Sequence, residues 1–363
     1  MSARRPPDAL VLEMVRFIRM YVVMTPEQLL VTALWVIHTH CVSVFDQTPY
    51  LAVTSPEKQC GKSRLLETLE LVVARPWPAI TPSEAVVYRQ IQAQMPTLLL
   101  DEVDAIFHHR SAERYEGLRA LLNNGNRRTA TVPRCVGTSN EIVEFSTFCA
   151  KVLAGIGTLP ETVADRSIPI RLERRTREQK VHGFHRREVE PAGKALRAQV
   201  EAWCKTNGKR LGTKRPKMPP ELSDRMQDGC ECLVAIADKL GCGVKARAAL
   251  VALLTAERLD SREMMQLKLL HDVRVVFGKR KTMSTKMLLA KLWDMDEAPW
   301  PKYYGSPLNE NDLANLLRPY SVKPMTVRVK LNGGVTKVAK GYKREHLHPA
   351  WDRYLGAGDD DTV

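Results

Sequence analysis

The apolar positions of the chain fall into two kinds of pattern, one typical of helices and one typical of strands. LLVTALWVI, from Leu29, is an apolar run that stops at His38, is too short to span a membrane, and predicts a buried helix. YLAVT (50–54) is a short β-prone run, whereas RLLETLELVVA (64–74) has apolar residues at helical spacing. TLLLD, which ends at Asp101, is typical of a buried strand in a parallel sheet.

The period of the pattern changes further along the first half of the chain. YEGLRALLNNG predicts a helix with leucines on one face that ends near Gly125. RRTATVPRCV and EIVEFSTF are extended stretches joined by the turn-like GTSN (137–140), and together they predict a β-hairpin. Two more strands are expected at 152–156 and 168–172. The first half therefore predicts alternating strands and helices.

The second half predicts helices and then a basic hairpin. Residues 176 to 243 look helical and basic, apart from NGKRLGTKRPKMPP, whose Gly/Lys/Pro content favours a flexible connection over a DNA contact. A helix capped by Ser223 follows this interruption. Two alternating basic strands around Asn332-Gly333 give a strong hairpin signal. Before that hairpin, helices are expected near 267–277, 285–293 and 309–317.

Charge and composition narrow the possible partners. The chain has 363 residues, enough for two or three domains, and a net charge of +14 that favours nucleic acid over an anionic membrane. Eight cysteines without a CxxC pair or a spaced Cys/His set support neither a zinc site nor a disulfide framework. Charged residues interrupt the N-terminal segment before a signal-like apolar region forms. We therefore expect a cytoplasmic protein with no membrane partner.

The stretch SPEKQCGKS (55–63) resembles a phosphate-binding loop whose first glycine is replaced by proline. A Gly-Lys-Ser arises by chance in roughly one such chain in ten, but here a strand precedes it and a helix follows. In such a loop, backbone N–H groups and the helix N-terminus face the phosphates of ATP, while Lys62 neutralises charge and Ser63 binds Mg²⁺. The residues expected to hold the nucleotide are Pro56, Glu57, Lys58, Gln59, Cys60, Gly61, Lys62, Ser63 and Arg64.

An acidic pair supplies the second half of the expected site. At the carboxyl end of a buried strand, Asp101 is expected to complete the Mg²⁺ shell, and Glu102 to orient the water that attacks the γ-phosphate. A solvated strand end is the plain alternative for such a pair. Combined with the loop, the pair favours ATP binding and hydrolysis.

The order of these elements resembles the AAA+ core. That resemblance implies that Thr158 is a polar sensor at the end of the strand after the acidic pair, and that Arg166 is an arginine finger. An arginine there offers bidentate donors to the phosphoryl group in transfer, and its supply by a neighbouring subunit couples hydrolysis to a ring. The alternative is a surface pair of Arg166 with Asp165 or Glu173.

The lid of the AAA+ fold and two basic surfaces supply the remaining candidates. Arg225 is the candidate second sensor, with Arg247 as a competitor. The first hairpin, around GTSN (137–140), resembles the pre-sensor hairpin that lines the channel of AAA+ DNA motors. The alternative is a solvated edge of a sheet. Three helices and a hairpin suggest a winged helix, whose third helix would enter a major groove, although such domains also dock proteins. The expected DNA-binding residues are Arg127, Arg128, Arg134 and Lys151 around the first hairpin, and Arg328, Lys330, Lys337 and Lys340 in the second.

Three stretches together look like one particular family. TPYLAVTSPEKQCGKSRLLE, TLLLDEVDAIF and FCAKVLAGIGTLPETVADRSIPIRLERR resemble the uncharacterised P-loop domain family of bacterial and phage genomes that is often fused behind primase-polymerase domains. The resemblance runs from about Pro26 to Leu355, and a loop without its first glycine is similar in that family. It implies a replication-linked ATPase and leaves open a separate primase as partner.

These observations predict an α/β fold, with an AAA+ type P-loop NTPase core around a parallel sheet, a helical lid and a C-terminal winged-helix domain. The expected function is a Mg²⁺- and ATP-dependent DNA motor of phage or mobile-element replication, a hexameric ring with single-stranded DNA in its channel. The alternatives are an ATP-switched helicase loader or initiator that does not unwind DNA, and a protein-remodelling defence ATPase. The expected domains are 1–47 (N-terminal helices), 48–176 (core), 177–260 (lid), 261–355 (winged helix) and 356–363 (disordered acidic tail).

Overall fold

A computed structural model describes residues 8–80, 82–107, 115–136, 141–157, 159–295, 298–303, 306–330 and 336–355. The chain divides into two compact units, residues 1–257 and 258–363, and each has its own hydrophobic core. Within the described residues, no helix combines the length and the apolar character that a membrane span requires.

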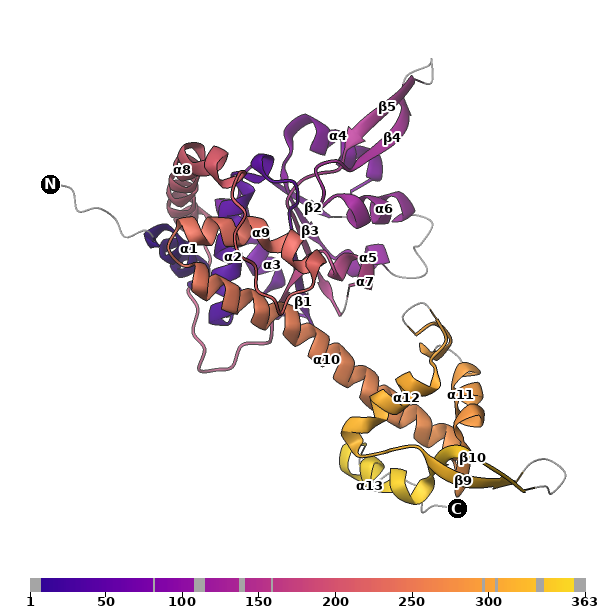
Figure 1. The fold of residues 1–363 in the computed structure, drawn as a ribbon. Coiled ribbons are helices and arrows are strands. Elements are labelled where there is room, and N and C mark those ends of the chain that lie inside the picture. The colour runs from indigo at the N-terminus through magenta and orange to yellow at the C-terminus, as the bar shows by residue number, and fades with distance from the viewer. Residues whose placement is uncertain are drawn as a thin grey trace. The chain divides into compact units, whose positions relative to one another are not determined.

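A five-stranded parallel sheet forms the centre of the first unit (Figure 1). Leu98 and Leu100 belong to one buried cluster and Leu99 to another, because successive side chains of a strand point to opposite faces. Both faces are covered, which explains why the strands read as continuous apolar runs. The α/β fold with a parallel sheet is thus confirmed. The strands, in the spatial order β2-β3-β6-β1-β7, are Pro76–Ile80, Thr97–Asp101, Lys151–Ile156, Tyr50–Ser55 and Ser167–Arg171.

Helices pack on the two faces of this sheet. The N-terminal helices and the helices that follow the sheet share one core with it, so they are part of the same unit. The cluster on this face draws on α1 (Ala9–Arg19), α2 (Pro26–Thr39), α3 (Lys62–Val72), α8 (Arg186–Leu211) and α9 (Asp224–Lys239). The cluster on the opposite face draws on α4 (Glu84–Gln94), α5 (Val103–Phe107), α6 (Glu116–Asn124) and α7 (Glu161–Ala164).

The connection expected at residues 207–220 is partly helical. Its first five residues complete α8, and a Cβ at the buried Gly208 would lie 3.7 Å from the Cβ of Cys41, so a small residue suits this packing. Arg215 then pairs with Glu231 of α9 at 2.9 Å. In contrast, residues 172–185, of which most were expected to be helical, contain no helix.

The predicted hairpin is confirmed. β4 (Thr131–Val136) pairs antiparallel with β5 (Glu141–Ser146), and the pair extends from the unit in Figure 1. Its base docks on α4, because the Ser146 N–H donates to the Gln92 side chain at 2.8 Å and the rings of Phe145 and Tyr88 lie 4.6 Å apart. The turn at 137–140 lies outside the described residues.

The second unit combines helices with a small antiparallel sheet of order β8-β10-β9. Its core contains the fully buried Trp300 and Phe277, and the long helix α10 (Gly243–Phe277) contributes to the cores of both units. Helices occupy the three predicted ranges, of which 267–277 is the end of the longer α10, and the hairpin is confirmed, while β8 and α13 were not predicted. The turn around Asn332-Gly333 and the acidic tail lie outside the described residues. The elements are β8 (Thr282–Ser284), α11 (Thr285–Trp293), η4 (Trp300–Lys302), α12 (Glu310–Leu317), η5 (Arg318–Tyr320), β9 (Met325–Lys330), β10 (Thr336–Lys343) and α13 (Arg344–Tyr354).

Candidate functional site

The loop at residues 56–61 joins the end of β1 directly to the start of α3. Gln59 and Gly61 both adopt the left-handed conformation, with φ of 63° and 95°, and Gly61 caps the helix. A glycine suits this cap because a side chain is strained at such a φ. Pro56 is exposed at the start of the loop, before the turn tightens. The predicted order of strand, loop and helix is therefore present despite the missing first glycine.

The amino group of Lys62 lies against the oxygen atoms of this loop. Its Nζ donates to Ser55 Oγ at 2.5 Å and to the Glu57 carbonyl at 3.3 Å, while Ser55 Oγ donates to the same carbonyl at 2.6 Å. The ammonium group thus lies beside the loop backbone that the sequence predicts to bind phosphate. A positive charge and a helix N-terminus at one place favour an anion.

The acidic pair lies next to the start of α3. Ser63 Oγ donates to Asp101 Oδ2 at 3.2 Å, and Asp101 Oδ1 accepts the Glu102 N–H at 2.9 Å. Glu102 is exposed, with φ of 57°, so its carboxylate is not used by the core. A hydroxyl and a carboxylate are oxygen donors of the kind that Mg²⁺ uses together with phosphate and water. Across the described residues, no cluster of three or more His, Cys, Asp or Glu forms a metal cage.

The strand β6 lies between β1 and β3 and ends beside the loop. The N–H of Gly157 donates to the Ser55 carbonyl at 3.1 Å, and Asp104 Oδ1 accepts the Ile156 N–H at 3.1 Å. Asp104 therefore ties α5 to the end of β6, a role that the sequence analysis missed although this residue is the third acid of the DEVD stretch. The candidate sensor Thr158 lies outside the described residues.

A wall of N-terminal residues flanks the loop, and the sequence analysis missed it. A Cβ at Gly61 would lie 3.8 Å from Cγ1 of Val22, so the segment after α1 passes over the loop. The next residue back, Tyr21, packs edge-on against Phe184, with ring centroids 5.2 Å apart. The Arg64 guanidinium lies 4.5 Å from the Phe184 ring and pairs with Glu67 at 2.7 Å. Only a continuous three-dimensional packing, with no sequence motif, identifies this wall.

Arg166 lies at the opposite edge of the sheet from the loop. Its carbonyl accepts the Tyr50 N–H at 3.0 Å, and the next residue, Ser167, pairs with Tyr50 at the start of β1. The loop begins at the other end of the same strand, about 16 Å away for five residues of β structure. The Arg166 side chain donates to the Thr162 carbonyl. It therefore cannot reach the loop of its own chain without leaving this edge.

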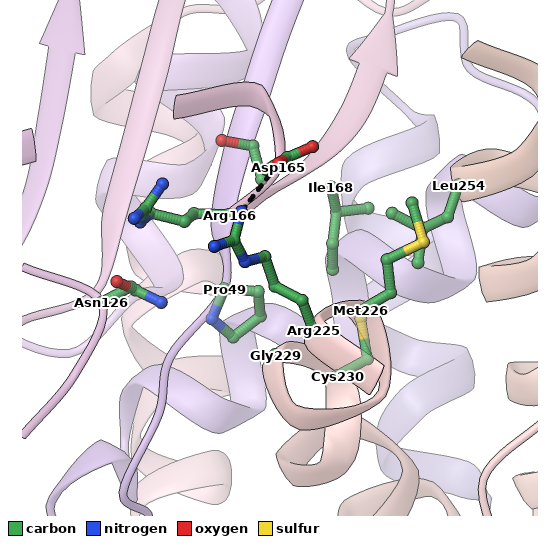
Figure 2. Close-up of a pocket in the computed structure, with 11 residues that line it drawn as sticks. Pro49, Asn126, Asp165, Arg166, Ile168, Arg225, Met226, Gly229, Cys230 and Leu254 are labelled. Carbon is green, nitrogen blue, oxygen red and sulfur yellow. Dashed lines mark hydrogen bonds and ion pairs between the residues drawn. The ribbon is translucent and has the colours of Figure 1, made fainter. Parts of the chain in front are cut away.

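A pocket at this edge gathers charged residues from several elements (Figure 2). The Arg225 side chain, from α9, donates to Asp165 Oδ2 at 2.9 Å, and Arg166 lies beside this pair. Burial lowers the pKa of the Arg166 guanidinium, and the charges of Arg225 and Arg127 lower this pKa further. The pocket is also lined by Asn126, whose side chain is 6% exposed and whose Oδ1 has no hydrogen-bond partner among the described residues.

Neither candidate second sensor lies at the loop of its own chain. Arg225 is bound to Asp165 at the opposite edge, which does not fit the expected contact with phosphates on the same chain. Arg247 makes two hydrogen bonds to the Asp238 carboxylate, at 2.6 and 2.8 Å, and a third to the Lys217 carbonyl. The surface pair expected as the alternative for Arg166 is also replaced, because Asp165 binds Arg225.

The arginines expected to line a channel are mostly engaged within the chain. Arg128 donates to the Ser43 and Phe45 carbonyls, and Arg134 is paired with Glu84. Arg127 is exposed, before the hairpin itself. The described hairpin strands carry Arg134 with two glutamates, Glu141 and Glu144, so they are not basic.

The expected DNA contact of Lys151 is wrong. Its side chain is fully buried, and Nζ donates to the carbonyls of Gly125, Thr147 and Cys149 at 2.9 to 3.0 Å. Burial lowers the pKa of this amine. Lys151 joins the end of α6 and the base of the hairpin to β6, so its role is structural.

The DNA-binding residues that the sequence predicts in the second unit lie on the β9–β10 hairpin, and none lies on the third helix. Arg328 of β9 pairs with Val338 of β10, and Lys340 lies two residues from Val338 on the same face. Arg328, Lys337 and Lys340 are exposed, while Lys330 ends β9. In contrast, α12 carries Glu310 and Asp312 and no lysine or arginine. A helix of this charge is a poor candidate for the major groove.

Comparison with known proteins identifies one curated relative. The "Uncharacterized 28.9 kDa protein in xis 5'region" of Saccharopolyspora erythraea is 36% identical over 162 residues, which is 44% of this chain and 59% of the relative. The chain therefore spans less than two thirds of that protein's length.

The solved structures that match this chain do so at low identity and low TM-score. "The apo structure of NrS-1 C terminal region (305-718)" is 14% identical with a TM-score of 0.40, over 93% of this chain and 74% of that one. "SCCmec type IV Cch - active helicase" is 10% identical with a TM-score of 0.42, over 96% and 68%.

A protein-family match is more informative than these likenesses. It covers residues 171–354, slightly more than half of the chain, from the end of β7 through α13. The loop and the acidic pair precede the matched region. On this match, the chain belongs to the family described as "Protein of unknown function (DUF3631)".

Proposed function

We propose that this protein is a Mg²⁺-dependent ATPase of the P-loop type, with an AAA+ core, that works as a ring-forming DNA motor. The observation that carries the proposal is the 3.2 Å contact between Ser63 Oγ and Asp101 Oδ2, at the helix start where Lys62 lies against the loop. Two elements 38 residues apart in sequence thereby bring together the donor types that a Mg²⁺-triphosphate needs.

Each residue of the site has a definite task in this proposal. The loop amides and Lys62 bind the β- and γ-phosphates, and Ser63 and Asp101 hold the Mg²⁺, which neutralises charge on the phosphates when bound. The exposed Glu102 carboxylate orients the attacking water. Gly157 keeps the end of β6 at the loop through its bond to Ser55, which supports a γ-phosphate sensor at the next residue, Thr158. These tasks describe hydrolysis at one end of the parallel sheet.

Arg166 acts on a second copy of the chain in this proposal. Its place at the opposite edge of the sheet, about 16 Å of β-strand from its own loop, supports supply of the guanidinium in trans. Head-to-tail contacts of this kind close into rings. A hexamer is the ring size we propose, with single-stranded DNA in its channel and the basic face of the C-terminal hairpin on phosphates.

A switch that loads or initiates without unwinding is the second candidate. The observation that favours it is the charge of the β4–β5 hairpin, where Arg134 is paired with Glu84 and two glutamates follow. Such a hairpin has no positive surplus with which to grip a phosphate backbone. In this version ATP-bound copies assemble on DNA, beside a helicase or a primase, and hydrolysis releases them.

The test measures steady ATP turnover with and without single-stranded DNA, together with strand displacement. Glu102→Gln is expected to keep ATP affinity and to lose turnover by roughly a hundredfold or more, since it removes the group that orients water. Glu116→Gln, on the exposed start of α6, is the matched control. Normal turnover in Glu102→Gln would contradict the ATPase site. ATP turnover that DNA stimulates, together with unwinding, supports the motor. ATP turnover that DNA does not stimulate, without unwinding, supports the switch.

A further inference from the structure

The pocket at the amino edge of the sheet holds more positive than negative charge. Arg166 and Arg225 line it together with the Asp165 carboxylate, which leaves one positive charge in excess, and Arg127 outside the pocket adds to the positive potential at Arg166. Like charges held together raise the free energy of the empty pocket. An anion that binds there relieves this repulsion, so the cluster is suited to an anionic ligand.

The pocket is built rather than a chance surface cluster. The buried Asn126 lines it, and the Asn126 Oδ1 is an acceptor that suits an arginine N–H rather than an anion. The edge itself is fixed by α2, whose Trp35 Nε1 donates to the Pro49 carbonyl at 2.8 Å, and by the Thr48 N–H, which donates to the Asn126 carbonyl at 2.9 Å. Arg225 arrives from a separate element, α9, and is 56% exposed.

At the carboxyl edge, which carries the loop, the nearby arginine is already engaged by other residues. Arg64, in the first turn of α3 after the loop, is paired with Glu67 and stacked on Phe184. Pro56 of the loop, Ser63 of α3 and Glu102 after β3 are exposed, so this edge is open to a second molecule. One edge thus presents the expected phosphates, and the other presents arginines with too few counter-charges.

We propose that Arg225 is a second arginine that binds the triphosphate of a neighbouring copy, and that Asp165 is an internal competitor that holds its guanidinium until that phosphate displaces it. This inference rests on the proposed function, and it replaces the expected role of Arg225 at its own loop. The exchange is one of acceptors only. The Arg225 N–H groups leave the Asp165 carboxylate and donate to phosphate oxygens, which offer bidentate, charge-assisted bonds.

The ion pair between Arg225 and Asp165 makes the position of α9 depend on the nucleotide of a neighbouring copy. Arg225 lies in the first turn of α9, whose buried face packs in the same core as α2 and α8. Its ion pair with Asp165 links α9 to the residue before Arg166 in the isolated chain. When a phosphate replaces Asp165, Arg225 binds the nucleotide of the neighbouring copy instead. The position of α9 then depends on whether that copy has bound ATP.

A compact polyphosphate matches this cluster of charges better than a DNA backbone does. The arginines converge on one small concavity between β7, α9 and the segment before β1, rather than following a line across the surface. A backbone contact instead spreads phosphates along an extended groove. The terminal phosphates of a triphosphate place several charges at one point, which matches the cluster.

The test compares ATP-dependent assembly of four variants by sedimentation velocity, each in the Glu102→Gln background so that ATP is retained. Arg225→Ala is expected to raise the midpoint concentration of assembly about tenfold, the effect of a lost charge-assisted bond. Asp165→Asn is expected to lower it about threefold, because the competing surface ion pair is lost. The double variant should behave like Arg225→Ala. Arg215→Ala, which loses a similar arginine pair with a carboxylate of α9, should leave the midpoint unchanged.

The inference predicts that Arg225→Ala and Asp165→Asn shift the assembly midpoint in opposite directions. A merely structural ion pair would make both variants shift the midpoint in the same direction, and this result would overturn the inference. Weaker binding of single-stranded DNA by Arg225→Ala without nucleotide, at an unchanged assembly midpoint, would also overturn it in favour of a DNA phosphate. Urea unfolding of each variant checks that the fold is intact.

The outcomes separate this inference from the proposed function. If the parent protein neither binds nor hydrolyses ATP, the proposed function fails. If it hydrolyses ATP while Arg225→Ala assembles like Arg215→Ala, only the role of Arg225 fails. If it binds ATP and remains a monomer at all concentrations, no neighbouring triphosphate reaches the pocket, and the inference is overturned.

Discussion

The two edges of the parallel sheet differ in chemistry although the same strands form both. At the carboxyl edge, Lys62 donates to Ser55 beside the loop, and Ser63 donates to Asp101. Glu102 is exposed at the same edge. At the amino edge, Arg225 is paired with Asp165, and Arg166 lies beside this pair. Parallel strands keep these edges apart by the length of a strand. We propose that each edge is half of a site and that a second copy of the chain supplies the other half.

The largest effect is expected from the amino edge. Arg166→Ala should lower the maximal rate of ATP turnover about a thousandfold, because a trans arginine stabilises charge in the transition state. The affinity for ATP, measured by fluorescence titration, should stay within about threefold, since the loop is untouched. Arg187→Ala, an exposed arginine at the start of α8, is the control. A normal rate in Arg166→Ala would remove the amino edge from the site.

A change at the carboxyl edge should affect binding as well as rate. Lys62→Ala removes the ammonium beside the loop and should weaken ATP affinity and lower turnover, the latter by roughly a hundredfold. Lys205→Ala on α8 serves as the control for loss of a lysine. Isothermal titration with ATP separates the two edges. Unchanged affinity in Lys62→Ala would show that this lysine does not bind phosphate.

The scaffold of the amino edge should weaken in acid. Burial lowers the pKa of His38 to about 3, and its Nε2 bonds Thr48 Oγ1 at 2.9 Å, just before β1. The unfolded histidine, with a pKa near 6.5, binds a proton more readily, so stability is fully present above pH 6.5 and falls as the pH drops toward 3. The loss should be roughly 3 to 5 kcal/mol.

Urea unfolding across this pH range measures the effect. His38→Gln should remove most of that slope, whereas His182→Gln, at an exposed position, should retain it. An equal slope in the wild type and His38→Gln would place the acid sensitivity elsewhere.

The smallest expected effect concerns DNA. Arg328→Ala and Lys340→Ala should each reduce the slope of log affinity against log salt by about one, because each removes one phosphate contact. Arg134→Ala should leave that slope unchanged, since this arginine already pairs with Glu84. Anisotropy titrations with single-stranded DNA at several salt concentrations measure the slopes. The reverse ranking would restore the channel role of the β4–β5 hairpin.

The sequence predicts the elements of the site well because their patterns are local. Continuous apolar runs mark β1, β3 and β6, and the loop follows directly from the order of strand, Gly-Lys-Ser and helix. The approach of Ser63 to Asp101 follows from the parallel topology, since the carboxyl ends of such strands share one edge.

The roles of single charged residues depend on contacts distant in sequence, and these the sequence does not predict. Lys151 begins an otherwise uncharged strand, and the fold encloses its amine among three carbonyls. Arg225 lies 60 residues from Asp165, and no local pattern relates them. The acidic character of α12 was available in the sequence, and it weakens the expected groove-binding helix without any structure.

Mixing two inactive variants tests the shared site most directly. Arg166→Ala retains an intact carboxyl edge, and Glu102→Gln retains an intact amino edge. If the two edges of different copies form one site, an equimolar mixture should regain up to about a quarter of wild-type turnover, through junctions that combine the intact edges. Turnover of the mixture that does not exceed that of the separate variants would contradict a site built from two copies.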